Sequence, residues 1–306
     1  MVRQSDIHIR GIEKADSNVD HGDQIYMKSK SKLVKFTALL LVICFLFPVI
    51  SGKDAYAKKK KTYLVCIDPG HYGKQNKVKG KYNYGYSEAE FDLKVAKELK
   101  KELKSYGIKV KMTRTGKNIK LFGFKNKILD DYYLSLRGEY AEGCDLFVSL
   151  HTNSNAVNAN KHKTFEQSIA LNKTIVIVNQ KTIQQKKYMS MANEIGKAVT
   201  NASFEAGLLE TNKFKTKTRK SIKEWTGIYN DSEGQKGTVC YRLNSRGTDY
   251  YGILRGAANV DVPGMIIEHG YHSIPEVRYA AKYEDLASKW AKADAYGIAK
   301  GFGLVE

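Results

Sequence analysis

Three apolar stretches of this chain run into residues that can bind a metal or transfer a proton. "YLVCIDPGH" ends at His71, "LFVSLH" ends at His151, and "PGMIIEHG" contains Glu268 and His269. Taken alone, one such histidine is best explained as a polar residue that ends a strand. Three stretches favour chemistry, because two imidazoles and a carboxylate form the ligand set of a catalytic zinc site that leaves a position for water. A further carboxylate can then act as general base.

A fourth stretch, "YSEAEFDLKVAKEL", places carboxylates at the start of a predicted helix. Glu88 and Glu90 are both candidates for the third ligand, although the helix dipole alone also explains acidic residues at this position. Ser87 and Glu90 match the S-x-x-E capping box, in which the serine caps the helix and the glutamate reaches back to it. That pairing would occupy Glu90 and leave Glu88, at the first helical position, to point out of the helix end.

The elements that would position these residues alternate between strand and helix. Predicted strands lie at 62–67, 108–113, 145–150, 173–178 and 264–267, and predicted helices at 91–107, 132–144 and 186–201. The helix at 91–107 has an apolar residue every four positions and ends on a glycine. This order predicts an α/β fold with a mostly parallel, mixed open sheet flanked by helices. In such sheets ligands bind at the carboxyl ends of the strands, so the zinc site is expected there.

The N-terminal region has the features of an export signal. The run at 33–50 is apolar apart from Lys35 and Thr37, lysines precede it, and Ala55-Tyr56-Ala57 offers a cleavage site. Its apolar core of about 15 residues is short for a membrane-spanning helix, which needs roughly 20. We therefore expect 1–57 to be an N-terminal extension and signal peptide, with translation starting at Met1 or Met27. The protein is expected to be secreted and to act outside the cell or in the wall, or to be membrane-anchored if the signal is not cleaved.

The rest of the chain is expected to form one catalytic domain, 62–306, after a basic linker at 58–61. A polar segment at about 203–247 has no clear period and is predicted to be a surface insertion. The net charge is +19, of which +17 lies beyond residue 57 because the first 57 residues carry eight basic and six acidic side chains. Such an excess suits anionic cell-wall polymers. Nucleic acid is not an expected partner, because the chain has no zinc-ribbon, P-loop or GxGxxG pattern, and we expect a monomer.

Five motifs together resemble the zinc-dependent N-acetylmuramoyl-L-alanine amidases (type 3), which cut bacterial peptidoglycan. They are "IDPGHYG", "SEAEFDLKVAKELK", Thr113-Arg114, "LRGEYAEGCDLFVSLHTNS" and "VPGMIIEHGYHS". The resemblance implies one Zn²⁺ per chain, held by His71, Glu88 and His151, with Glu268 as the catalytic glutamate. It also implies an autolysin-type enzyme that hydrolyses the bond between N-acetylmuramic acid and L-alanine.

Other residues at or near the motifs have less specific roles. Arg114 and Arg137 match family positions, where they either brace loops or contact substrate, and Asn153 either donates to substrate or orients His151. The chain departs from the family at 269–274, "HGYHSI", where Thr-Gly-Phe-Leu-Ser-Asn is usual. His269 and His272 are therefore expected to be loop residues, with a role near the zinc as the alternative.

Two rival functions fit parts of the same sequence. A zinc carboxypeptidase that trims the stem peptides of peptidoglycan would need an arginine for the terminal carboxylate, and Arg255 is the candidate. A non-catalytic wall-binding protein with a degenerate site would need no complete set of ligands and base. The presence of two histidines and two glutamates in matching motifs argues against that second rival.

Overall fold

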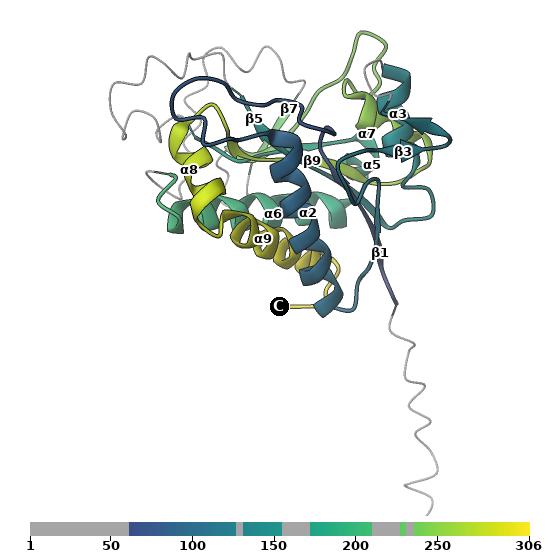
Figure 1. Ribbon diagram of the computed structural model, residues 1–306. Coiled ribbons are helices and arrows are strands. Elements are labelled where there is room, and N and C mark those ends of the chain that lie inside the picture. The colour runs from purple at the N-terminus through teal and green to yellow at the C-terminus, as the bar shows by residue number, and fades with distance from the viewer. Residues whose placement is uncertain (1–60, 127–130, 155–171, 210–226, 231–235) are drawn as a thin grey trace, which may run out of the picture. The chain divides into compact units, whose positions relative to one another are not determined.

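The computed structural model describes residues 61–126, 131–154, 172–209, 227–230 and 236–306 (Figure 1). The predicted signal region at 1–57, the linker up to residue 60 and much of the predicted insertion lie outside the described residues. Among the helices that are described, none combines the length and the apolar character needed to cross a membrane.

The described strands alternate with helices along most of the chain. The strands are β1 (Leu64–Pro69), β2 (Lys109–Met112), β3 (Lys120–Leu121), β4 (Phe124–Lys125), β5 (Leu146–Asn153), β6 (Ile175–Val178), β7 (Gly227–Asn230), β8 (Lys236–Tyr241) and β9 (Gly264–Tyr271). The helices are α2 (Glu88–Ser105), α3 (Asp131–Glu139), α5 (Gln180–Ile183), α6 (Lys186–Glu205), α7 (Gly252–Asn259), α8 (Pro275–Tyr283) and α9 (Leu286–Gly301).

Seven of the described strands form one sheet in the order β2-β1-β5-β9-β6-β8-β7. The first four of these are parallel to one another. β6 is antiparallel to β9, β8 is parallel to β6, and β7 is antiparallel to β8. β3 and β4 form a separate antiparallel pair. The α/β fold with a mostly parallel, mixed sheet flanked by helices is therefore confirmed.

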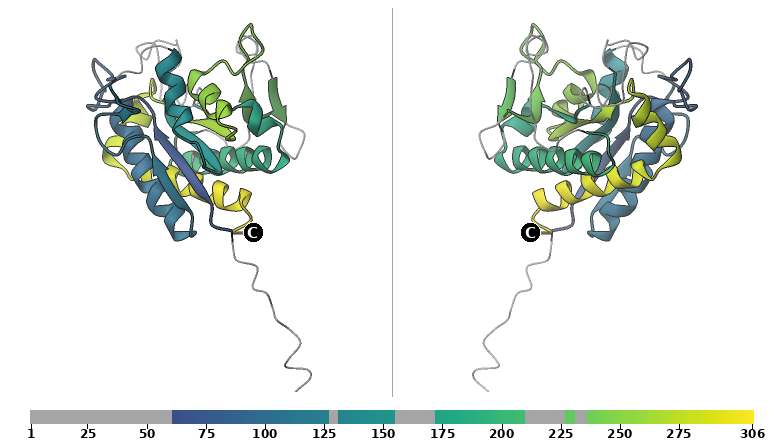
Figure 2. Two further views of the ribbon diagram at one scale, coloured as in Figure 1. Left: turned by 90° about the vertical axis from the view of Figure 1, so that its right-hand side faces the viewer. Right: turned by 90° about the vertical axis from the view of Figure 1, so that its left-hand side faces the viewer.

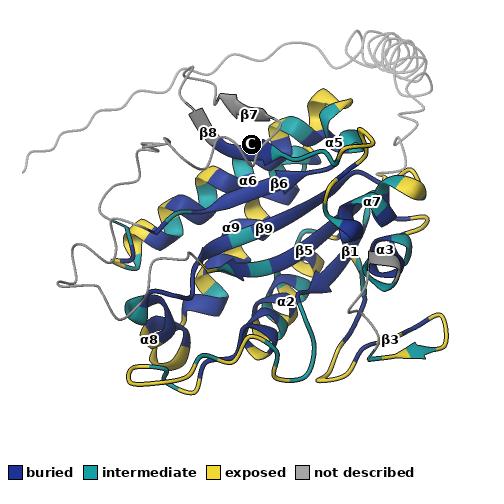
Figure 3. Ribbon diagram, turned by 90° about the horizontal axis from the view of Figure 1, so that it is seen from above, coloured by how far each residue is buried: buried dark blue, intermediate teal, exposed yellow. Residues whose placement is uncertain are grey.

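Helices cover both faces of this sheet (Figure 2). On one face α6 and α9 lie side by side and α2 packs against α9, while α3 and α7 pack together on the other face. The α3–α7 contact depends on glycine, because a Cβ on Gly256 would lie 1.9 Å from the Ser135 carbonyl oxygen and one on Gly138 would lie 2.0 Å from that of Ile253. The central strands between the two layers are almost entirely buried (Figure 3).

Several predicted elements have different bounds in the structure: α3 ends at Glu139 and not at 144, α6 continues past 201 to Glu205, and β9 continues past 267 to Tyr271. Helix α2 begins at Glu88, directly after Ser87 as the capping pattern predicted and three residues before the periodic stretch at 91–107, and β5 continues past its predicted end to Asn153, so that His151 lies within a strand. At its other end α2 stops as predicted, because Gly107 adopts a positive φ of 75° and the amide of Ile108 donates to the carbonyl of Leu103.

The region predicted as an insertion contributes two strands to the sheet. β8 pairs with β6, so that Val239 and Cys240 lie opposite Val176 and Ile177, and β7 forms the edge beyond it. These two residues of β8 are buried. A buried apolar pair is too short to produce a detectable period in the sequence, which is why the strands were not predicted.

Candidate metal centre and catalytic site

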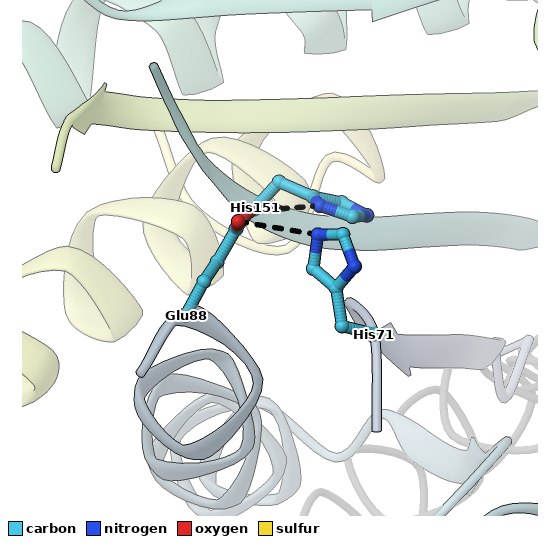
Figure 4. Close-up of side chains that lie close together, drawn as sticks. All are labelled: His71, Glu88 and His151. Carbon is cyan, nitrogen blue, oxygen red and sulfur yellow. Dashed lines mark hydrogen bonds and ion pairs between the residues drawn. The ribbon is translucent and has the colours of Figure 1, made fainter. Parts of the chain in front are cut away.

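Three neighbouring parallel strands bring the predicted site residues together at their carboxyl ends (Figure 4). His71 is the second residue after β1, and His151 lies near the end of β5. Glu268, in β9, is the direct Cα partner of His151. Glu88 reaches the same place as the first residue of α2, the helix that follows β1.

The side chains of His71, Glu88 and His151 converge in a geometry that suits a zinc ion. Their ligand atoms all lie within 4.8 Å of one another. Glu88 Oε2 is 3.2 Å from His71 Nε2, and Glu88 Oε1 is 3.1 Å from His151 Nδ1. Ligand atoms about 2 Å from a tetrahedral zinc ion lie roughly 3.3 Å from each other. The donor set and its spacing therefore fit zinc.

The carboxylate of Glu88 is buried and held from several sides. Oε2 also accepts a hydrogen bond of 2.6 Å from Asn76 Nδ2, and Oε1 accepts one of 3.1 Å from the amide of Thr152. Burial opposes ionisation, but the hydrogen bonds to His151 and His71 outweigh it and lower the pKa of Glu88 well below its usual range. Burial lowers the pKa of His151, which favours the neutral imidazole that a metal requires.

The capping box predicted for Ser87 and Glu90 is wrong. The Ser87 hydroxyl makes no cap bond and instead donates to the carbonyl of Gln75, at 3.1 Å. Glu90 is exposed, whereas Glu88 is only 2% exposed. Glu88, and not Glu90, thus lies with the two histidines. The loop after β1 contacts the start of the helix here, because Gln75 bonds to Ser87 and Asn76 bonds to Glu88.

Glu268 faces the same cavity, which has a volume of about 710 Å³. Its Oε2 atom is buried and has no hydrogen-bond partner among the described residues. Burial, and then the negative charge of Glu88, raise the pKa of Glu268 to about 8. A buried carboxylate oxygen without a partner is costly in a folded protein, and such groups concentrate at functional sites.

Arg114 and Arg137 brace the chain around the site. Arg114 is buried and donates to the carbonyls of Pro69, Gly70 and Ala89 at 3.1, 2.6 and 2.8 Å. Arg137 forms a buried ion pair of 2.7 Å with Asp68, and it also donates to Pro69 and more weakly to the carbonyl of His71, at 3.3 Å. Both arginines thus use their donors on the protein, although Arg137 also borders the cavity.

The remaining sequence candidates separate into one cavity residue and one that lies elsewhere. Asn153 lines the cavity, and its Oδ1 accepts a hydrogen bond of 2.7 Å from the amide of Ser154 rather than contacting His151. Arg255 donates to the carbonyl of Asp249 at 2.8 Å and is not among the described residues that line the cavity.

Both additional histidines were expected in a loop, which is wrong for His269 and confirmed for His272. His269 belongs to β9 and is buried on the side of the strand that faces α9. His272 follows β9 and lines the cavity, where its Nδ1 is 2.9 Å from the carbonyl oxygen of Thr152 and 3.9 Å from Glu88 Oε2. Its place near Glu88 matches the alternative that the sequence left open.

Two residues at the site had no signal in the sequence. Asn76 contacts both His71 Nε2, at 3.1 Å, and Glu88, and it adopts a positive φ of 51°. Gly70 is required by close packing, because a Cβ there would lie 2.5 Å from His151 Cε1 and 2.6 Å from Asp92 Oδ2. An asparagine in a polar loop and a glycine after proline are too common to be recognised as site residues.

Comparison with known proteins supports the resemblance over most of the chain. The sequence profile of the N-acetylmuramoyl-L-alanine amidases matches residues 65–300. The probable cell wall amidase LytH of Staphylococcus aureus is 34% identical over 97 residues. That alignment covers 31% of this chain and 28% of LytH, so it spans little more than a quarter of the relative's length.

Two solved structures show the same fold. The catalytic domain of CwlV from Bacillus (Paenibacillus) polymyxa var. colistinus is 20% identical with a TM-score of 0.51. The CwlD amidase of Clostridioides difficile, solved in complex with the GerS lipoprotein, is 17% identical with a TM-score of 0.53. Each match covers 80% of this chain and 100% of the other. The profile match over most of the chain confirms the resemblance seen in the motifs and shows that the chain belongs to the N-acetylmuramoyl-L-alanine amidase family.

Proposed function

We propose that this protein is a zinc-dependent hydrolase of the amide bond between N-acetylmuramic acid and L-alanine in peptidoglycan, acting as an autolysin-type enzyme. The observation that carries the proposal is the convergence of His71, Glu88 and His151 beside Glu268 in one cavity. Family membership suggests which bond is cut. The cavity, of about 710 Å³, is within the usual size range of ligand pockets.

His71, Glu88 and His151 are the three residues that would hold the zinc ion. When bound, zinc would supply a Lewis acid that lowers the pKa of a water molecule toward about 7 and polarises the scissile carbonyl. Because two of the ligands are neutral imidazoles and one is a carboxylate, a bound Zn²⁺ ion would leave the site with a net positive charge. The hydrogen bonds from Asn76 and the Thr152 amide hold the Glu88 carboxylate in the orientation in which it contacts both histidines.

Glu268 is proposed to be the general base. Its Oε2 has no hydrogen bond to give up, so it can take the proton of the attacking water and return it to the leaving amine. The pKa of about 8 reflects burial and the charge of Glu88. A divalent cation between the ligands would lower that pKa again by Coulomb attraction, which favours the ionised base.

The carboxypeptidase alternative receives less support from the structure. It needs an arginine aimed at the substrate's terminal carboxylate. Arg255 instead donates to the carbonyl of Asp249 and is not among the described residues that line the cavity. Arg137 borders the cavity, but the ion pair with Asp68 and its bonds to main-chain carbonyls already use its guanidinium group.

Digestion of purified cell wall tests which bond is cut. We expect the zinc-loaded mature protein to release peptides with free alanine amino termini, because hydrolysis at the lactyl group leaves the amine on alanine. Mass spectrometry and amino-terminal labelling of the soluble products measure this. Release of single carboxyl-terminal residues, with the glycan–peptide bond intact, would support the carboxypeptidase instead.

Glu88→Ala should strip zinc from the protein and abolish turnover, since two histidines alone leave too few ligands for an ion that prefers four donors. Glu90→Ala is the matched control two residues along the same helix. Because Glu90 is exposed and makes no cap, this change should keep the metal and alter stability by less than about 0.5 kcal/mol. Metal analysis and urea denaturation of both variants provide the readout, and a zinc-free Glu90→Ala protein would reverse the assignment.

Glu268→Gln should retain zinc while turnover of cell wall falls by a factor of about 10² or more, the scale of general-base catalysis. Glutamine keeps the size of the side chain but cannot accept the proton. Bound zinc and released alanine-terminated peptides should be measured on one preparation. Near-normal turnover with intact metal would remove Glu268 from the mechanism.

We propose that the protein is exported and acts in the cell wall, where the charge of +17 beyond residue 57 attracts anionic polymers in a salt-dependent way. The A-x-A site predicts a mature chain that begins at Lys58. Amino-terminal sequencing of the protein recovered from the wall and the medium checks this. An intact amino terminus in the membrane fraction would indicate an uncleaved anchor.

A further inference from the structure

A buried imidazole–carboxylate pair lies directly behind the proposed catalytic strand. His269 follows Glu268 in β9 and points to the opposite side, where its ring stacks on Trp290 of α9 with centroids 5.1 Å apart. The exposed fraction of His269 is 1% and that of Asp294, one turn further along α9, is 0%. No step of the proposed hydrolysis uses either side chain.

Both ring nitrogens of His269 have an oxygen partner. Nε2 lies 2.8 Å from Asp294 Oδ2, and Nδ1 lies 3.1 Å from the main-chain carbonyl oxygen of His151. A carbonyl oxygen can only accept, so Nδ1 must carry a proton. One further proton lies between Nε2 and Oδ2, whichever group owns it. The Asp294 carboxyl group therefore holds the ring in the state and orientation in which Nδ1 donates to His151.

The hydrogen bond from His269 to His151 falls at an irregularity in the sheet. His151 pairs with Glu268, but Asn153 pairs with Tyr271, so β9 contains one extra residue at this point. Such a bulge locally disrupts the hydrogen-bond ladder and changes the direction in which nearby side chains of the strand point. The side chain of Asn172 also supplies a bond here, because its Oδ1 accepts from the amide of Tyr271 at 2.8 Å.

We propose that His269 and Asp294 are positioning residues, which fix the main chain of His151 against β9 and so hold the metal ligand and Glu268 at a constant separation. This inference rests on the roles proposed above for His151 and Glu268. Asp294 lies on α9 and His151 on β5, and the ring of His269 bonds to both. Among the described residues, this is the only polar link from Asp294 to the site.

Two conservative variants separate the bonds of the imidazole. His269→Asn places an amide nitrogen near the position of Nδ1 and keeps the donor to His151, whereas His269→Gln places one near Nε2 and keeps only the link to Asp294. Zinc affinity, measured by competition with a chromogenic chelator, should fall about tenfold or more in His269→Gln. In His269→Asn it should stay within about threefold of the wild type, although both variants lose thermal stability.

Trp290→Phe is the control for general damage to this part of the core. It removes the hydrogen bond from Trp290 to Ser203 and part of the stacking surface, but leaves both bonds of His269. Its melting temperature should fall while its zinc affinity stays at the wild-type level. Equal loss of zinc affinity in the asparagine and glutamine variants, or a loss in all three variants that follows melting temperature, would overturn the positioning role.

A ¹⁵N spectrum of His269 and an assay of cell-wall turnover complete the test. If either His269 variant fails to fold, the ¹⁵N spectrum of the zinc-loaded wild-type protein must show a protonated Nδ1 at His269, and an unprotonated Nδ1 contradicts the proposal. Cell-wall turnover is assayed in parallel. A wild-type protein that binds zinc but releases no alanine-terminated peptides would refute the proposed function, while the comparison of zinc affinities would still judge the positioning role.

Discussion

The position of the candidate metal centre depends on a buried ion pair at the end of β1. Arg137 and Asp68 are almost completely inaccessible, and a buried charge is tolerated only when it is paired and fully hydrogen-bonded. Asp68 also accepts a bond of 2.7 Å from Ser149 in β5 and one from Thr113. The pair thereby ties β1 to its neighbouring strand and to α3. Arg137 also donates to the carbonyls of Pro69 and His71, so that His71, the first proposed ligand, leaves the sheet in a fixed direction.

Acidic groups accumulate on the other side of the site. Burial and then the charges of Glu88 and Glu268 raise the pKa of Asp92 well above its usual value, and the pKa of Glu268 is raised in the same way. Oxygens of both residues remain without a hydrogen-bond partner among the described residues. Arg114 offsets only part of this effect at Asp92. A divalent cation at the three ligands would stabilise the ionised carboxylates, so folding and metal binding should support each other.

The two layers of helices contact different parts of the site. On one side α3 and α7 form a wall of the cavity and approach closely through glycines, with Arg137 reaching from that wall to β1. On the other side α9 supports the sheet with Trp290 and Asp294, which contact the face of β9 that points away from the cavity. Glu268, the proposed base, and His269, the proposed positioning residue, therefore alternate along β9, since successive side chains of a strand point to opposite faces.

Sequence alone determined the alternation of the main strands and helices up to residue 201, the convergence of the histidines and glutamates at the strand ends, and the family. These features depend on local periodicity and on motifs with a chemical meaning, which adjacent residues carry by themselves. Only the tertiary structure decided how Ser87 and His269 are used and that the two arginines brace the chain. Ser87 finds Gln75 across a loop, Arg137 finds Asp68 from a different element, and His269 meets Asp294 on a helix. Such polar partners are selected by burial and distance in three dimensions, and no spacing in the sequence specifies them.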